Sequence, residues 1–452
     1  MKIKLDENWM TKNAGYPLDD DEVKRYNSVL PSEAQLEHAK TPFYCFIHFG
    51  MNTATGREWG NATETVDDFT ITKVKPEQWA KCVKSAGAQG IIFTCKHHDG
   101  FCLWNTGTTD FNSMNAPIGK DIVKEVADAC KKEGLKFGIY LSPWDMHEET
   151  YGTRHYNDFF CRQLTELLSN YGEVFEVWLD GAKGADAKSF VYDWERYYKI
   201  IRTIQPMANI AICGPDIRWV GNEQAIARKS EYCVVPKMLT LAETLENKEE
   251  SKRSGVSMLN SKSEDLGSRE VLSQNAELAW YPAEVDVSIR DGWFYPGGDS
   301  VKSADKLFKI YLNSVGNNSF LLLNVPPTDK GVIHRKDRGV LKKLGLKLED
   351  AFTEPVLSQS FGELKEGYVE FKFDSAKKLR YCVIEEDISR GQRIEKFDLY
   401  LEKSAGKYKK VYSGTVIGMK KIIKLKGSAE GAVMVIRQSR QAPVIQKIAF
   451  YD

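Results

Sequence analysis

The chain has 452 residues, which is more than one ordinary core holds, so its length indicates two domains or one large barrel with an appendage. Its 63 basic and 63 acidic side chains balance, so no net charge points to nucleic acid or an anionic membrane as a partner, and a neutral substrate is favoured. The nine cysteines include no CxxC pair and are typical of buried thiols rather than of a disulfide framework. Nothing in the composition predicts the oligomeric state.

The first 40 residues are polar and charged, and we expect them to form an N-terminal surface segment with a short helix from Ser32 to Ala39. They contain no apolar stretch of the kind that forms a signal peptide or crosses a bilayer. The sequence therefore predicts a cytoplasmic protein without membrane contact. A secreted or periplasmic protein is the alternative if a signal has been removed.

Residues 41–346 alternate apolar runs with amphipathic helical patterns. Successive strand and helix units of roughly 40 residues favour a parallel α/β fold, a (β/α)8-like barrel of the TIM type. A charged, irregular stretch at residues 236–279 is too long for a plain connection and is predicted to be an insertion near the site. The predicted strands are Pro42–Gly50, Gly90–His98, Leu135–Leu141, Val174–Leu179, Asn209–Cys213, Tyr232–Val235, a segment around Glu284, and Phe320–Pro327.

From about residue 355 the apolar pattern changes to a period of two. Seven short alternating runs, separated by glycine or charged turns, predict that residues 355–452 form a C-terminal antiparallel β-sandwich. This small domain is expected to support the barrel.

Polar side chains follow several of the predicted barrel strands. His48, His97 or His98, Tyr140 and Asp180 all come at strand ends. The carboxyl ends of parallel barrel strands form a common rim where active sites lie, so these side chains are candidate functional groups. For Asp180, which precedes a glycine, the alternative is that it turns the chain or caps the next helix.

Five motifs in a fixed order resemble the α-L-fucosidases of glycoside hydrolase family 29. The similarity runs from about residue 40 to residue 340, and it implies a barrel followed by a sandwich. The motifs are Phe46-Ile47-His48-Phe49-Gly50, Glu58-Trp59, Lys96-His97-His98-Asp99-Gly100-Phe101, Val177-Trp178-Leu179-Asp180-Gly181 and Leu323-Asn324-Val325-Pro326-Pro327.

The resemblance implies a retaining exo-α-L-fucosidase that needs no cofactor and no metal, with Asp180 as the nucleophile. The segment Gly221-Asn222-Glu223 is similar to that of the branch that cleaves α-1,3- and α-1,4-linked fucose, which makes Glu223 the general acid/base and Lewis-type fucosylated oligosaccharides the substrates. Glu284, at the end of a possible seventh strand, is the rival acid/base or a residue on the leaving-group side. The remaining residues expected around fucose are His48, Glu58, Trp59, His97, His98, Tyr140, Trp178 and Trp293.

The sequence contains the groups that a retaining glycosidase needs. A retaining glycosidase needs two carboxyl groups roughly 5 Å apart, and Asp180 and Glu223 are separated by about one strand–helix–strand repeat. The acid must hold its proton near neutral pH, which we expect from burial beside Trp219 or from the charge of Asp180. Trp178 and Trp293 suit the C6 methyl group and apolar edge of fucose.

Two other functions remain open from the sequence. One is a metal-dependent barrel hydrolase with His48, His97, His98 and Asp180 as ligands, although adjacent histidines lack the helical spacing of common metal motifs. The other is a non-catalytic glycan-binding protein that has kept the pocket. A lectin requires neither a nucleophile nor an acid, so the presence of both Asp180 and Glu223 favours an enzyme.

Overall fold

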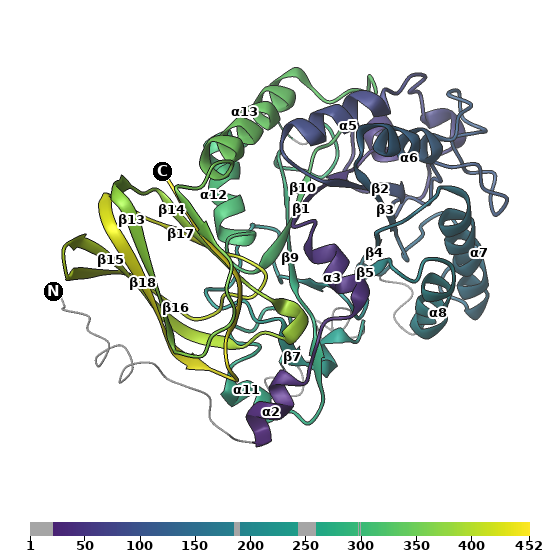
Figure 1. The fold of residues 1–452 in the computed structure, drawn as a ribbon. Helices are drawn as coiled ribbons and strands as arrows, with labels where there is room; N and C mark the ends of the chain where they lie inside the picture. Colours follow the sequence, from purple (N-terminus) through teal and green to yellow (C-terminus); the bar gives the residue numbers. More distant parts are fainter. Residues whose placement is uncertain (1–20, 185–189, 243–258, 297, 299) are drawn as a thin grey trace.

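Eight parallel strands form the central sheet of the structure, a computed structural model that describes residues 21–184, 190–242, 259–296, 298 and 300–452. The strand order is β5-β4-β3-β2-β1-β10-β9-β6, and a parallel bridge between Ala211 and Ile217 joins the two edges into a nearly closed barrel (Figure 1). The predicted barrel is confirmed. Its strands are β1 (Phe43–Ile47), β2 (Gly90–Lys96), β3 (Lys136–Leu141), β4 (Glu176–Leu179), β5 (Asn209–Ile212), β6 (Arg218–Trp219), β9 (Ala283–Ser288) and β10 (Ser319–Asn324).

Amphipathic helices pack their apolar faces on the outside of these strands. Their ends follow local sequence rules: Pro76 occupies the first turn of α5, Asp121 caps α6, and Gly134 ends α6 in the left-handed conformation at φ 70°. A short helix, α4 (Met51–Thr55), lies in the loop after β1. The covering helices are α5 (Pro76–Ser85), α6 (Ile122–Glu133), α7 (Arg154–Asn170), α8 (Trp194–Ile204), α12 (Ala304–Ser314) and α13 (Arg335–Phe352).

The sixth barrel strand differs from the predicted one. The sequence predicts it at Tyr232–Val235, but β7 (Val234–Pro236) pairs antiparallel with β8 (Leu278–Trp280) outside the barrel. The barrel position is taken by β6, which follows β5 after a short loop without an intervening helix. A strand of two residues is too short to leave a periodic pattern, so the sequence favours the more apolar run at Tyr232–Val235.

The described part of the N-terminal segment lies partly inside the fold, in contrast to the predicted surface location. α2 (Asp21–Asn27) precedes α3 (Glu33–Ala39), the helix predicted from the sequence, which begins with a capping box between Ser32 and Gln35. His38 of α3 is 2% exposed and lies 2.6 Å from Glu176, the first residue of β4. The helix therefore closes the amino-terminal end of the barrel.

The C-terminal domain is the predicted antiparallel sandwich. One sheet has the order β11-β19-β14-β17, with β12 also on β19, and the other has the order β13-β18-β15-β16. Apolar side chains from both sheets form one core between them. The strands are β11 (Leu357–Gln359), β12 (Gly362–Glu363), β13 (Tyr368–Lys378), β14 (Tyr381–Glu386), β15 (Ile394–Ser404), β16 (Lys407–Gly414), β17 (Lys421–Lys424), β18 (Ser428–Ser439) and β19 (Val444–Tyr451).

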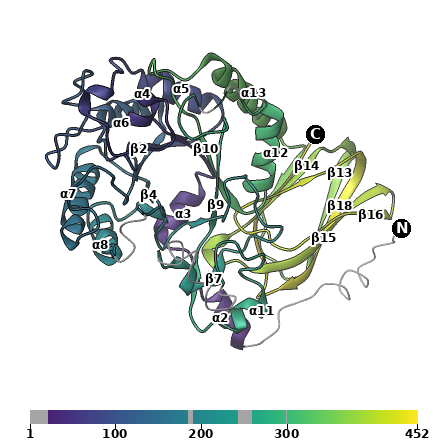
Figure 2. The same ribbon diagram turned by 180° about the vertical axis from the view of Figure 1, so that it is seen from behind.

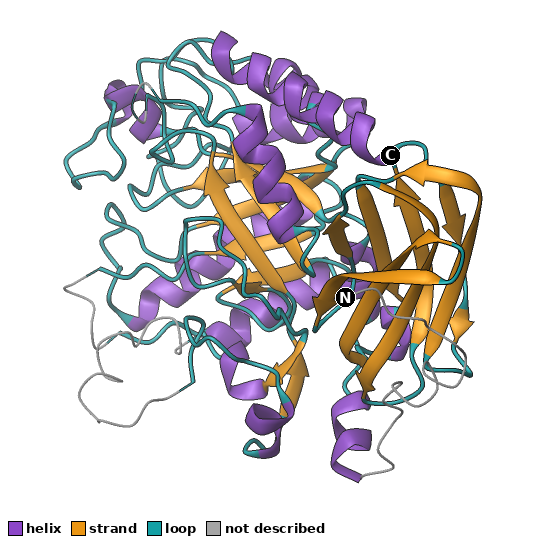
Figure 3. Cartoon of the chain, turned by 90° about the vertical axis from the view of Figure 1, so that its left-hand side faces the viewer, coloured by secondary structure: helices purple, strands orange, loops and turns teal. Residues whose placement is uncertain are grey.

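Helices α12 and α13 lie between the barrel and the sandwich (Figures 1 and 2), and Figure 3 shows the strands of the two domains side by side. The barrel was predicted to end at residue 346, but α13 continues to Phe352, whose ring packs on Tyr381 of β14. Asn318 also accepts a hydrogen bond from the backbone of Met419 at 2.7 Å. Within the described ranges, no helix is both long and apolar enough to span a bilayer.

Candidate active site

A cavity of about 800 Å³ opens at the carboxyl ends of the barrel strands. The parallel topology brings the loops after all strands to this one rim, so residues far apart in the sequence converge on it. Of the site residues predicted from the sequence, all but Glu284 line the cavity. They are His48, Glu58, Trp59, His97, His98, Tyr140, Trp178, Asp180, Glu223 and Trp293.

Asp180 follows the last residue of β4, and its carboxylate is held in one orientation. Its Oδ2 accepts a hydrogen bond from the Tyr140 hydroxyl at 2.9 Å, and its Oδ1 accepts one from the backbone N–H of Ala182 at 2.8 Å. The bond to Ala182 is the turn contact that the alternative interpretation of this residue predicts. Asp180 thus shapes the turn and also presents a fixed, partly exposed carboxylate to the cavity.

The hydrogen bonds of His48 define its tautomer. Its Nδ1 lies 3.0 Å from Oδ1 of Asn324, whose amide nitrogen donates to the carbonyl of Trp293 at 2.8 Å. The amide oxygen must therefore accept from a protonated Nδ1, which leaves Nε2 as an acceptor. Burial lowers the pKa of His48 to about 3, so the ring is neutral at pH 7.

His98 is fixed in the same way. Its Nδ1 lies 2.7 Å from the Ser142 hydroxyl, which donates to the carbonyl of Trp144 at 2.6 Å. The hydroxyl therefore accepts from Nδ1–H, and Nε2 is an acceptor that lies 3.9 Å from Oδ2 of Asp180. Burial lowers the pKa of His98, against the opposing effect of the Asp180 charge.

His97 has the opposite tautomer. The amide nitrogen of Asn52 donates to the carbonyl of Glu58 at 3.2 Å and lies 3.3 Å from Nδ1 of His97, which therefore accepts. Burial, together with the neighbouring rings of His98 and His48, holds the pKa of His97 well below its usual range. The three neutral rings thus offer two acceptors and one donor, a mixture that suits hydroxyl groups.

Glu58 ties the loop after β1 to the loop after β9. Its carboxylate accepts hydrogen bonds from the backbone N–H of Trp293 at 2.9 Å and of Phe294 at 3.3 Å. Burial raises the pKa of Glu58, and these two bonds oppose that shift. The connection places the Trp293 ring 5.2 Å from the ring of His48. Trp59 is 54% exposed, and its ring edge meets His98 at 5.5 Å on the cavity rim.

Glu223 lies on an exposed part of the rim, so the burial expected for it from the sequence is not present. Glu58 and Asp286 line the same cavity, and the pKa of each is raised mainly by burial, with a smaller contribution from the charge of Glu223. Arg228 holds this loop by donating to the carbonyls of Val220 at 3.1 Å and Ser263 at 2.7 Å. Through Ser263, the predicted insertion supports the loop, but no described residue of 236–279 lines the cavity.

Glu284 does not lie at a strand end, contrary to the prediction. It is the second residue of β9, is fully buried, and lies below the cavity inside the barrel. Its carboxyl group accepts hydrogen bonds from the Tyr44 hydroxyl and, at 2.8 Å, from Nε1 of Trp178. The apolar run before Glu284 belongs to β8 and the turn after it, and the barrel strand β9 begins only at Ala283, so Glu284 lies near its start.

A comparison with protein families places the chain that carries this cavity. Residues 9–350 match the family model for α-L-fucosidase, which covers the whole barrel. The chain belongs to the α-L-fucosidase family. Members of this family are glycoside hydrolases, so the chain is an enzyme of that class, and its barrel and cavity are those of a fucosidase-family protein.

Relatives of this fucosidase-family enzyme match over both domains. The chain is 34% identical to α-L-fucosidase 1 of Arabidopsis thaliana, over 93% of this chain and 87% of that protein. A crystal structure of a candidate α-L-fucosidase from Bacteroides ovatus is 40% identical, with a TM-score of 0.87, and covers 97% of this chain and 77% of that one. A Ruminococcus gnavus fucosidase of glycoside hydrolase family 29, solved with fucose, is 27% identical, with a TM-score of 0.80 and 97% of each chain covered.

The fucosidase-family cavity also contains residues that sequence reasoning did not assign to it. Asp286 could have been found, because Glu284, Asp286 and Ser288 alternate along β9 with valines that pack against the outer helices. Loop residues left no comparable signal. Besides Gly181, Ala182 and Gly292, the additional lining residues are Phe46, Trp144, Lys183, Ile212, Trp219, Asp286 and Asp291; the sequence pointed to Trp219 only as a neighbour of Glu223.

The metal-dependent alternative requires four side chains to converge on one point. Within the described ranges, no group of three or more His, Cys, Asp or Glu side chains has an arrangement that could hold a metal ion. The arrangement of His48, His97, His98 and Asp180 gives the metal-dependent alternative no structural support. Hydrogen bonds to Asn324 and Ser142 already occupy Nδ1 of two of these rings.

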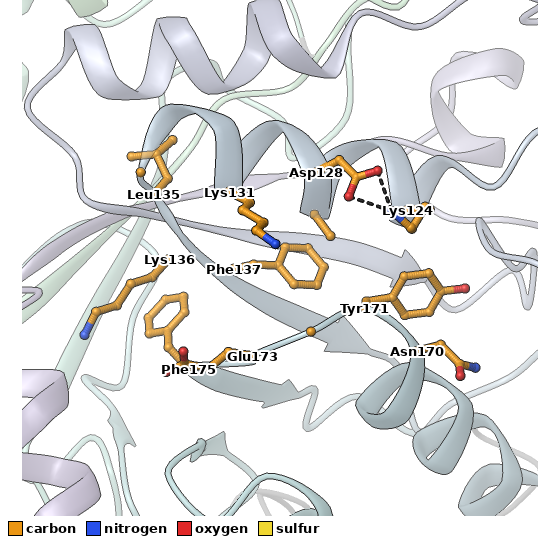
Figure 4. Close-up of a pocket in the computed structure, with 13 residues that line it drawn as sticks. Lys124, Asp128, Lys131, Leu135, Lys136, Phe137, Asn170, Tyr171, Glu173 and Phe175 are labelled. Carbon is orange, nitrogen blue, oxygen red and sulfur yellow. Dashed lines mark hydrogen bonds and ion pairs between the residues drawn. The ribbon is translucent and has the colours of Figure 1, made fainter.

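A second hollow, of about 610 Å³, lies at the opposite end of the barrel, beside the starts of β3 and β4 (Figure 4). Lys124, Lys131 and Lys136 lie around the rings of Phe137 and Phe175, and Lys124 is paired with Asp128. The hollow contains none of the histidines or paired carboxyl groups of the first cavity. The cavity at the carboxyl ends of the strands is therefore the candidate active site.

Proposed function

We propose that the enzyme is a retaining exo-α-L-fucosidase that removes terminal α-1,3- or α-1,4-linked fucose from Lewis-type oligosaccharides. The observation that carries the proposal is the Asp180 carboxylate, fixed by Tyr140 and the Ala182 backbone in a cavity lined by three neutral histidines. A carboxylate with a defined direction and neutral partners for hydroxyl groups is what double displacement at a sugar requires.

In the first step, Asp180 attacks the anomeric carbon while the glycosidic C–O bond breaks. Glu223 gives its proton to the departing oxygen, and a fucosyl ester of Asp180 remains. In the second step, ionised Glu223 removes a proton from water, whose oxygen attacks the same carbon and releases Asp180 and fucose. Two inversions give net retention.

The cavity walls favour fucose over charged ligands. The acceptors His48 Nε2 and His98 Nε2 and the donor His97 Nε2–H can pair with ring hydroxyls without bringing a charge into the site. Trp178 and Trp293 supply apolar surface for the C6 methyl group. The absence of one hydroxyl would leave a buried histidine nitrogen unpaired, which supports selectivity.

The linkage preference rests on the segment from Gly221 to Glu223. Glu223 is exposed, so in this mechanism the leaving sugar covers it and supplies the desolvation that an acid needs to keep its proton. The contacts of Arg228 give the loop a defined position at the rim, where a branched sugar would be recognised.

The first test is fucose release from 4-nitrophenyl α-L-fucoside, 2′-fucosyllactose, and Lewis a and Lewis x trisaccharides, each with and without chelator. Chelator-insensitive cleavage of the Lewis sugars, with 2′-fucosyllactose untouched, would support the proposal. Loss of activity with chelator would favour the metal-dependent alternative, and binding without cleavage would favour a glycan-binding protein. NMR of the first-formed fucose should show the α-anomer if the reaction is retaining.

Variants test the two roles. Asp180→Ala should reduce turnover to background while Asp291→Asn, a change to an exposed carboxylate on the same cavity, should leave most of it. For Glu223→Ala we expect azide to restore cleavage of the aryl fucoside, because azide can react with the fucosyl ester without a general base. Azide rescue of Glu284→Ala, with none for Glu223→Ala, would reverse the assignment.

A further inference from the structure

A cluster of acids lies sealed in the barrel below the cavity, and the proposed mechanism does not use it. Glu176 and Glu284 are both fully buried, on β4 and β9. His38 of α3 contacts Glu176 from below, and the hydroxyl of Tyr44 donates to Glu284. Burial holds the pKa of Glu284 well above its usual range. Burying an acid destabilises the fold unless its carboxyl group is hydrogen-bonded, so the partners of Glu284 indicate what it does.

On the side that faces the cavity, Glu284 contacts Trp178, which forms part of the cavity wall. Nε1 of Trp178 donates to Oε1 of Glu284 at 2.8 Å, so the only polar atom of this indole is bound below the cavity. The ring is stacked on Tyr140 at 5.3 Å and 23°, and Phe46 meets it edge-on at 5.0 Å. Trp178 lines the cavity but is only 5% exposed, and the surface it offers there is carbon.

We propose that Glu284 is a positioning residue that keeps the Trp178 wall apolar and thereby selects a 6-deoxy sugar over its 6-hydroxy counterpart. The inference rests on the proposed function and deepens it. Fucose and L-galactose differ only by the hydroxyl at C6. A hydroxyl placed against the carbon surface of Trp178 would lose its water without gaining a partner, whereas a methyl group would be favoured.

The geometry also explains why a carboxyl group is used. Glu284 offers one oxygen to Tyr44 and the other to Trp178, so the barrel interior fixes the indole from below. Without the Oε1 acceptor, the indole N–H would be buried and unpaired. The ring could then regain a hydrogen bond only by turning its N–H toward the cavity, where a C6 hydroxyl could accept it.

The experiment compares kcat/KM for 4-nitrophenyl α-L-fucoside and 4-nitrophenyl α-L-galactoside. For the unmodified enzyme we expect a ratio of about 10², the usual limit when an apolar pocket rejects an added hydroxyl. Glu284→Gln keeps an acceptor for the indole and should preserve the ratio within about twofold. Glu284→Leu removes it and should reduce the ratio by about tenfold or more, mainly through lost fucoside activity.

A matched control separates positioning from simple stability. Glu386 in the sandwich is also buried, and its carboxyl group accepts backbone N–H bonds from Arg393, Ile394 and Gly418. Glu386→Leu should lower the thermal midpoint as Glu284→Leu does but leave the substrate ratio unchanged. If Glu284→Leu does not fold, Tyr44→Phe is the substitute, because it removes the hydroxyl that donates to the other oxygen of Glu284. This change should lower the ratio of fucoside to galactoside kcat/KM by about two- to fivefold.

The outcomes are distinct. A folded Glu284→Leu variant with the original ratio, or an unmodified enzyme that cleaves both glycosides equally well, would overturn the positioning role of Glu284. An unmodified enzyme that cleaves neither glycoside, nor any Lewis sugar, would refute the proposed function itself. Recovery of the ratio in Glu284→Gln, compared with Glu284→Leu, is the result that a purely space-filling role cannot produce.

Discussion

The ion pair between Lys96 and Asp145 should determine the stability of the loop that carries the active-site histidines. Nζ of Lys96 lies 2.7 Å from Oδ2 of Asp145, and the side chains are 0% and 2% exposed. Lys96 directly precedes His97 and His98, and the backbone N–H of Met146 donates to the His98 carbonyl at 2.8 Å. The pair therefore joins the end of β2 to the loop after β3, and Lys96→Met is the change that breaks it.

Lys96→Met leaves the carboxylate of Asp145 buried without its cation, and this determines the expected loss in the free energy of unfolding. Removing one partner of a buried pair typically costs about 3–5 kcal/mol. Asp145 keeps the backbone N–H groups of His147 at 3.0 Å and Glu148 at 2.9 Å, so we expect the lower end, about 3 kcal/mol. Lys96→Met/Asp145→Asn removes the stranded charge but retains an acceptor for those groups, and should recover about 1–2 kcal/mol.

Urea unfolding followed by tryptophan fluorescence measures the loss of unfolding free energy in the barrel, because all ten tryptophans precede residue 294 and none lies in the sandwich. The coupling between the two changes is then obtained from a double-mutant cycle. The reasoning would be refuted if Lys96→Met cost less than about 1 kcal/mol, the range of an exposed pair, or if the double variant were no more stable than the single one.

Three further predictions follow from contacts in and below the cavity. Tyr140→Phe removes a hydrogen bond to the Asp180 carboxylate and should reduce kcat/KM on an aryl fucoside by about 10- to 100-fold, with the urea midpoint nearly unchanged. Burial raises the pKa of Glu176 from 4.5 to about 8, so between these pH values the folded state holds a proton that the unfolded state has released. Stability should therefore fall as pH rises from about 4.5 to about 8, and Glu176→Gln should reduce this slope by up to about 1.4 kcal/mol per pH unit in urea titrations. Arg228→Met should release the Glu223 loop, because it removes the hydrogen bonds to the carbonyls of Val220 and Ser263. Cleavage of Lewis sugars should then fall about tenfold more than cleavage of an aryl fucoside, because the aryl leaving group needs little acid assistance. Equal losses on both substrates would contradict this prediction.

The sequence predicted the strand-end residues well because each follows a buried strand whose apolar run is unmistakable. His48, His97 and Asp180 come directly after β1, β2 and β4, and the topology alone then brings them to one rim. The sandwich was equally predictable, since its strands alternate with a period of two and are separated by turn residues.

The remaining features depend on contacts that no local pattern encodes. β6 has two residues, and its place in the barrel is determined by pairing with β9. Glu284 and His38 occur in unremarkable stretches of sequence, yet both are buried near the barrel axis because strands and a helix from distant parts of the chain enclose them. The exposure of Glu223 follows from the path of its loop, which Arg228 fixes through residues about 35 positions later.

The docking of α3 has a consequence for how the chain folds during synthesis. The helix is made early, but its partners come later: Ala34 accepts from Asn209, and Gln35 donates to the carbonyls of Asp216 and Trp280, the last of these 245 residues further along. At a typical rate of about 5–20 residues per second, Gln35 waits roughly 12–50 s for that partner to emerge from the ribosome. Glu176, the partner of His38, is 138 residues further along and emerges roughly 7–28 s after it, so the nascent barrel stays open at its base until most of its strands have been translated.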